Sequence, residues 1–104
     1  MGKGITMKLK NKIALVTGSS RGVGRAVALG FAGEGAKVVV NYTSNEKAAN
    51  EVVAAIQALG SEAIAVKADV AKKEDAEKLV AAAVEAFGRL DILVNNAGFT
   101  RPSL

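Results

Sequence analysis

At 104 residues the chain suits a single domain with a hydrophobic core, and half of its residues are hydrophobic. It contains no cysteine and no histidine, which excludes disulfides and thiolate chemistry and argues against a metal site. The net charge of +4 is modest and the N-terminal lysines have no interleaved aromatic residues, so no nucleic-acid partner is expected.

Residues 1–11 are expected to form an N-terminal tail, ahead of a domain over residues 12–104. No apolar run is long enough to span a membrane, and the stretch from Met1 to Lys12 lacks the apolar centre of a signal peptide. We therefore expect a cytoplasmic protein with no membrane partner. Residues 1–6 also fit a myristoylation pattern, but patterns this short often match by chance, and Met7 is an alternative start.

From Ile13 onward the sequence repeats one unit, made of an apolar run, a polar loop, an amphipathic helix and a glycine. Such apolar runs are typical of strands that are buried on both faces of a parallel sheet. The expected strands are residues 13–16, 37–41, 63–66 and 91–95. The expected helices run from Gly22 to Glu34, from a capping box at residues 43–46 to Gly60, and up to Gly88.

Each expected helix has apolar residues at the spacing of one face, and those of the second helix are expected to point inward. These residues are Val23, Val27 and Phe31 in the first helix, Ala48, Val52, Ile56 and Leu59 in the second, and Ala76, Leu79, Val80, Ala83, Val84 and Phe87 in the third.

The alternation of strands and helices predicts an α/β fold with a parallel sheet. Right-handed crossovers would place the first two helices on one face, and the third helix would cross back over the other face. The expected strand order is 3-2-1-4, which is half of a doubly wound Rossmann fold. Ligands bind beyond the carboxyl ends of the strands where the order reverses, here between strands one and four.

A glycine-rich stretch over residues 17–24 follows the first strand and leads into the first helix. A helix N-terminus offers unpaired N–H groups, and glycines let a phosphate approach the backbone. The spacing is Gly-x-x-x-Gly-x-Gly, which differs from the common dinucleotide fingerprint and from a Walker loop. An ordinary turn is the alternative interpretation. The phosphate site is favoured because the topology brings this stretch beside residues 95–98.

Three motifs in order carry a family resemblance: Thr17-Gly18-x-x-x-Gly22-x-Gly24, Asp69-Val70, and Asn95-Asn96-Ala97-Gly98. With them, the chain from about residue 9 resembles the N-terminal part of the short-chain dehydrogenase/reductase family. Within that family it is most similar to the 3-oxoacyl-acyl-carrier-protein reductases, partly through residues 39–42 and 98–101.

The resemblance implies that Gly18, Gly22 and Gly24 shape a turn for the cofactor pyrophosphate. Asp69 would bind the adenine amino group, and Val70 would pack on the ring. Asn95 would brace the strands and meet the adenine ribose, and the backbone of Ala97 and Gly98 would pass the nicotinamide ribose. A cap on the third helix is the alternative role for Asp69, and loop hydrogen bonding alone is the alternative for Asn95. The full expected set of cofactor-binding residues is Gly18, Ser20, Arg21, Gly22, Val23, Gly24, Asn41, Tyr42, Thr43, Asp69, Val70, Asn95, Ala97 and Gly98.

The choice of cofactor follows from the end of the second strand, where NAD enzymes place an acid on the ribose hydroxyls. That position is Asn41, and no acid occurs before Glu46. Arg21 can instead reach a 2′-phosphate, in a charged hydrogen bond worth about 1.5–3 kcal/mol. The sequence therefore predicts NADP(H) over NAD(H), with a solvated surface charge as the alternative for Arg21.

No catalytic residue is expected within this chain. The family uses a serine, a tyrosine and a lysine four residues after the tyrosine, on elements that follow the Asn-Asn-Ala-Gly motif, and the chain ends at Leu104. Its only tyrosine, Tyr42, has Glu46 at the lysine spacing. The expected function is the truncated, NADP(H)-binding part of a short-chain oxidoreductase, and the alternative is a non-catalytic nucleotide-binding or self-assembling module. The fourth strand would lack a neighbour, so a homo-oligomer through its edge is expected.

Overall fold

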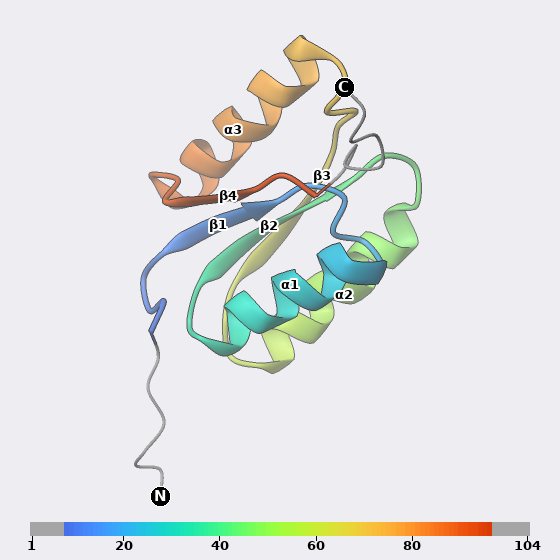
Figure 1. Ribbon diagram of the computed structural model, residues 1–104. Coiled ribbons are helices and arrows are strands. Elements are labelled where there is room, and N and C mark those ends of the chain that lie inside the picture. The colour runs from blue at the N-terminus through green and yellow to red at the C-terminus, as the bar shows by residue number, and fades with distance from the viewer. Residues whose placement is uncertain (1–7, 97–104) are drawn as a thin grey trace, which may run out of the picture.

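The computed structural model describes residues 8–96 and shows a parallel four-stranded sheet with helices on both faces (Figure 1). The strands are β1 (Ile13–Val16), β2 (Lys37–Tyr42), β3 (Ala63–Lys67) and β4 (Ile92–Val94), and the helices are α1 (Gly22–Gly33), α2 (Glu46–Ala58) and α3 (Lys73–Phe87). The sheet order is β3-β2-β1-β4, with α1 and α2 on one face and α3 on the other. The predicted half of a doubly wound Rossmann fold is confirmed.

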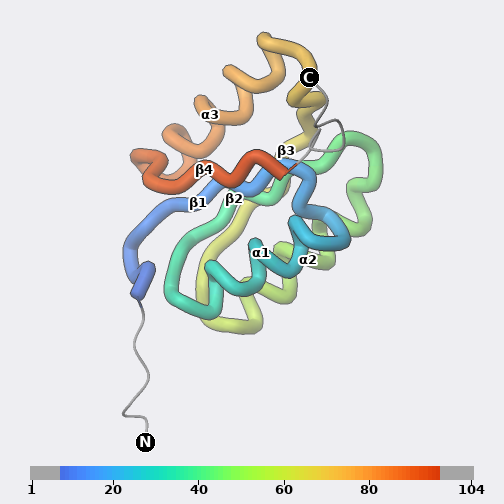
Figure 2. Tube along the Cα trace, in the orientation of Figure 1, coloured from blue at the N-terminus to red at the C-terminus, as the bar shows by residue number. Residues whose placement is uncertain are grey.

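The first and last described strands lie side by side in the sheet (Figure 2). β1 lies between β2 and β4, and Leu15 is in register with both Val39 and Leu93. The last described strand therefore pairs with the first, and the segments that follow them lie at the same carboxyl edge.

The core consists of two layers, one on each side of the central strands. Val16, Val38 and Val40 pack with buried residues of α1 and α2, whereas Leu15 and Val39 pack with α3. Successive side chains of a strand point to opposite faces, so the apolar runs of β1 and β2 supply both layers.

The face that α3 covers retains exposed apolar surface. Leu79 and Ala83 are buried against the sheet, but Val80 is 39% exposed, Val84 is 45% exposed and Leu93 of β4 is 57% exposed. The periodic apolar set of the third helix therefore includes both buried and exposed side chains. A single helix, α3, covers this face within the described residues (Figure 1).

The ends of two helices differ from the sequence prediction. Asn45, and not Thr43, is the N-cap of α2, since its side-chain oxygen accepts a hydrogen bond from the Ala48 N–H at 3.0 Å. The predicted capping box is therefore wrong by two residues. Leu59 is the C-cap of α2 and is 53% exposed, and Val23 in the first turn of α1 is 71% exposed, so neither side chain joins the core.

Residues 8–11, expected in the tail, form a turn against the end of α1. The Leu9 N–H donates to the Glu34 carbonyl at 2.8 Å, and the Lys12 N–H donates to the Leu9 carbonyl at 2.9 Å. Gly35, at φ +97°, lies against the Lys10 backbone. The domain therefore begins before residue 12.

Candidate functional site

The glycine-rich turn after β1 is hydrogen-bonded directly to the segment that follows β4. The Thr17 N–H donates to the Val94 carbonyl at 3.0 Å, and the Asn96 N–H donates to the Thr17 hydroxyl at 2.7 Å. The Asn96 side-chain amide also donates to the Gly18 carbonyl at 3.3 Å. The predicted convergence of the two segments is confirmed as far as Asn96, while Ala97 and Gly98 lie outside the described residues.

Each of the three positions in the motif favours glycine for its own steric reason. Gly18 and Gly22 have φ of +62° and +63°, in the left-handed region that favours glycine. Gly24 is in α1 with ordinary helical geometry, but a Cβ there would overlap the Gly18 carbonyl and lie 2.8 Å from the Asn96 side-chain nitrogen. The third glycine therefore lets α1 begin directly against the turn.

The N-terminus of α1 has the properties of an anion site. Its N-cap, Arg21, has an extended backbone and makes no side-chain cap, and the first turn contains no acidic residue. The first N–H groups of a helix have no acceptor within the helix and lie at the positive end of its dipole. Arg21 is exposed beside them. A phosphate group placed there would meet backbone donors and a guanidinium together.

The structure corrects the expectation that Asn41 faces a ribose. Asn41 is 1% exposed, and its side-chain oxygen accepts a hydrogen bond from the Gly18 N–H at 2.8 Å. Its side-chain nitrogen lies within hydrogen-bonding distance of the Tyr42, Val66 and Ala68 carbonyls, at 3.1–3.3 Å. The polar atoms of Asn41 are thus used inside the protein. Tyr42 is also buried, whereas Thr43 is exposed directly after the strand.

Ser19 completes this contact between the turn and β2. The serine is fully buried, accepts from the Asn41 N–H at 2.9 Å and donates to the Val16 carbonyl at 2.7 Å. Its own N–H donates to the Asn41 carbonyl at 2.9 Å. Sequence reasoning missed this role of Ser19 and Asn41. The available signal was an asparagine at the end of an otherwise apolar, buried strand.

Asp69 closes a turn between β3 and α3. Its Oδ1 accepts from the Ala71 N–H at 3.0 Å, and its own N–H donates to the Asp75 carboxylate at 2.8 Å. The N-cap of α3 is Lys72, so the alternative in which Asp69 caps this helix is wrong. One Asp69 oxygen holds the turn, and the turn places the carboxylate at the carboxyl edge of the sheet.

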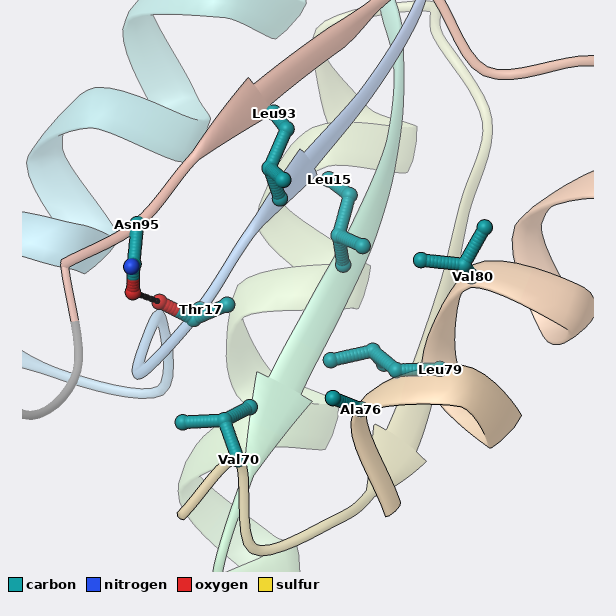
Figure 3. A pocket seen from close by; sticks show the side chains of 8 residues that line it. All are labelled: Leu15, Thr17, Val70, Ala76, Leu79, Val80, Leu93 and Asn95. Carbon is teal, nitrogen blue, oxygen red and sulfur yellow. Dashed lines mark hydrogen bonds between the residues drawn. The ribbon is translucent and has the colours of Figure 1, made fainter. Parts of the chain in front are cut away.

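A small hollow of about 140 Å³ opens beside this edge, between the sheet and α3 (Figure 3). One end of the hollow is formed by Val70 and by the two polar residues Thr17 and Asn95. The Thr17 hydroxyl is 3.4 Å from the Asn95 side-chain oxygen. The remaining lining is apolar: Leu15, Ala76, Leu79, Val80 and Leu93. Val70 and Asn95, two of the predicted site residues, therefore line the same hollow.

Other site types find no support in the part of the chain that is described. Across residues 8–96 there is no cluster of histidine, cysteine, aspartate or glutamate that could hold a metal ion. Within the same range, no helix is both long and apolar enough to cross a membrane.

Comparison with known proteins agrees with the geometry. The family model for short chain dehydrogenases matches residues 12–104. The 3-oxoacyl-[acyl-carrier-protein] reductase of Synechocystis sp. is 52% identical over 96 residues, which are 92% of this chain and 39% of that enzyme.

Two solved structures extend the comparison. A short chain dehydrogenase from Burkholderia cenocepacia, in complex with NADP, has a TM-score of 0.86 and 50% identity, and the match covers 90% of this chain and 38% of that one. A 7α-hydroxysteroid dehydrogenase, in complex with NADH and 7-oxo glycochenodeoxycholic acid, has a TM-score of 0.83 and 40% identity, with 92% and 37% covered.

The chain thus spans less than two fifths of the length of these relatives. The family model nevertheless covers the whole sheet, all its helices and each motif of the site. The chain belongs to the short-chain dehydrogenase/reductase family of oxidoreductases.

Proposed function

We propose that this chain is the NADP(H)-binding part of an oxidoreductase that reduces a carbonyl, or oxidises the corresponding alcohol, by hydride transfer. The observation that carries the proposal is the set of three glycines. Two of them allow the turn, and the third brings the open N-terminus of α1 against it. The bound cofactor would supply the hydride in the reduction and accept it in the oxidation, and the residues of this chain would bind and orient the cofactor.

The proposed contacts divide along the carboxyl edge of the sheet. The turn and the first residues of α1 would hold the pyrophosphate: Gly18, Ser20, Gly22, Val23 and Gly24. Thr43, after β2, and Arg21 would lie toward the 2′-phosphate, with Tyr42 supporting them from the core. Asp69 and Val70 would meet the adenine, and Asn95, Ala97 and Gly98 the riboses. We assign no catalytic residue among these.

Arg21 is proposed as the residue that selects NADP(H) over NAD(H). Relatives occur in complex with NADP and with NADH, so the family alone does not decide. Arg21→Ala should weaken NADPH binding about 10- to 100-fold and leave NADH binding nearly unchanged. Arg25→Ala is the matched control, because it removes the same charge from an exposed position in the same helix. Equal wild-type affinities for the two cofactors in a fluorescence titration would refute the selection.

A self-assembling module is the second candidate, and an exposed apolar surface favours it. β4 pairs with β1 on one side, and among the described residues no strand pairs with its other edge. Leu93 of that strand is 57% exposed and lines the same hollow as Val80 of α3, which is 39% exposed. Such edges and patches favour pairing with another chain. We propose a two-fold dimer through β4.

Light scattering at high micromolar concentration tests the dimer. Leu93→Lys should shift the chain toward the monomer, whereas Leu59→Lys, at a similarly exposed position at the end of α2, should not. A monomeric wild-type chain would refute the dimer. The transcript beyond Leu104 separates the two functions, because a frame that continues to a Tyr-x-x-x-Lys sequence supports the oxidoreductase and an immediate stop supports the module.

A further inference from the structure

The backbone of Gly18 is hydrogen-bonded on both sides by asparagine side chains that come from different parts of the chain. Its N–H donates to the Asn41 side chain from β2, and its carbonyl accepts from the Asn96 side chain that follows β4. The same carbonyl is the group that a Cβ on Gly24 would overlap. A shift of Gly18 would therefore move the turn relative to the N-terminus of α1.

Only a carboxamide satisfies the surroundings of the Asn41 side chain. One end must accept a hydrogen bond from the Gly18 N–H, and the other must donate to backbone carbonyls of Tyr42, Val66 and Ala68. An ionised aspartate has acceptors at both ends, and a serine is too short to span the gap. Because Asn41 is only 1% exposed, water has little access to its side chain to replace a missing partner.

We infer that Asn41 is a positioning residue for the cofactor turn and makes no contact with the cofactor ribose. Its carboxamide fixes Gly18 on β2 and β3, and this contact sets the position of the pyrophosphate turn against α1. The inference rests on the proposed function, because it assigns Asn41 a role in that same site. It also moves the choice between cofactors away from this position at the end of β2.

Asn41→Asp distinguishes the buried anchor from a ribose contact. An acid that faced the ribose would favour NADH. An acid in the buried position leaves the carbonyls without a donor, so it should weaken NADPH and NADH binding alike, by about tenfold or more, with their ratio unchanged. In ligand-free protein, hydrogen exchange of the Gly18 amide, followed by NMR, should accelerate by at least about tenfold. Asn41→Ser should likewise weaken the binding of both cofactors and accelerate Gly18 exchange, and it replaces Asn41→Asp in the experiment if the aspartate variant does not fold.

Val52→Ala is the control for stability, since Val52 is fully buried on the inward side of α2, in a core cluster that includes no residue of the turn. It should lower the midpoint of unfolding but keep cofactor affinity and Gly18 exchange close to those of the wild type when measured well below that midpoint. A variant of Asn41 that loses no more affinity than this control, or one that gains preference for NADH, would overturn the inference.

The exchange measurement needs no cofactor, which keeps the two proposals distinguishable. If the wild type binds neither NADPH nor NADH, the proposed function fails and the cofactor role of Asn41 fails with it. If the wild type binds but Gly18 exchange is unchanged in the Asn41 variants, the positioning role alone is overturned.

Discussion

Replacement of Gly24 by alanine should separate the steric role of this glycine from the general effect of glycine in a helix. A Cβ at this position would overlap the Gly18 carbonyl oxygen, and it would lie 2.8 Å from the Asn96 side-chain nitrogen and 3.0 Å from the Gly18 carbonyl carbon. Two of these atoms belong to the Gly18 backbone, which hydrogen bonds to the Asn41 and Asn96 side chains hold in place. The turn and α1 therefore have to move apart.

The size of the effect follows from two opposing contributions. Alanine in place of glycine favours a helix by up to about 1 kcal/mol, whereas overpacking a close contact costs about 1–3 kcal/mol. Gly30→Ala provides the control, because Gly30 is in the same helix and a Cβ there would meet nothing within 4 Å. The first contribution is shared by the two variants, so their difference in unfolding free energy isolates the overlap at about 1–3 kcal/mol.

Thermal unfolding and a cofactor titration provide the measurements. Gly30→Ala should raise the Tm, and Gly24→Ala should have a Tm lower than that of Gly30→Ala by at least about 4 °C. Gly24→Ala should also weaken NADPH binding by about tenfold, since α1 no longer begins against the turn. If Gly24→Ala is as stable as Gly30→Ala and keeps its affinity, the steric explanation of the motif is wrong.

Two further predictions concern the sheet and α2. The Ile13 N–H, followed by the Arg89 guanidinium, holds the pKa of Asp91 below its ordinary value. The ionised carboxylate therefore stabilises the folded protein above its unfolded-state pKa, and this stabilisation is lost as the pH falls through the folded-state pKa. In urea unfolding, Asp91→Asn should therefore lose less stability than the wild type between about pH 7 and about pH 3. An equal loss in both proteins would contradict this. Asn45→Ala should cost about 1 kcal/mol of unfolding free energy and Thr43→Ala almost nothing, and the reverse order would restore the predicted capping box.

Most of the fold could be predicted because its strands are continuous apolar runs. A run such as residues 37–41 is compatible with burial on both faces of a parallel sheet, and the alternation with helices leaves few topologies. The errors lie where burial depends on neighbours. Val23 and Val84 have apolar spacing in their helices, yet Val23 is 71% exposed and Val84 is 45% exposed.

The site could be predicted at the level of motifs and less well at the level of side chains. The meeting of the glycine turn with Asn96 follows from strand order alone. The inward direction of Asn41 does not follow from its place at the end of β2. It follows from alternation along that strand, since Val38, Val40 and Tyr42 belong to one core layer and Val39 to the other, which places Asn41 on the side of Val39.

The pairing of β4 with β1 has a consequence for the order in which the site can form. Thr17 and Asn96 are separated by 79 positions in the chain, yet a hydrogen bond between them helps to shape the turn. During synthesis the glycine motif emerges early, but it cannot acquire this contact until almost the whole described domain has been made. Because a ligand that binds only the completed turn also stabilises the docked β4, cofactor concentration and closure of the sheet should be thermodynamically coupled.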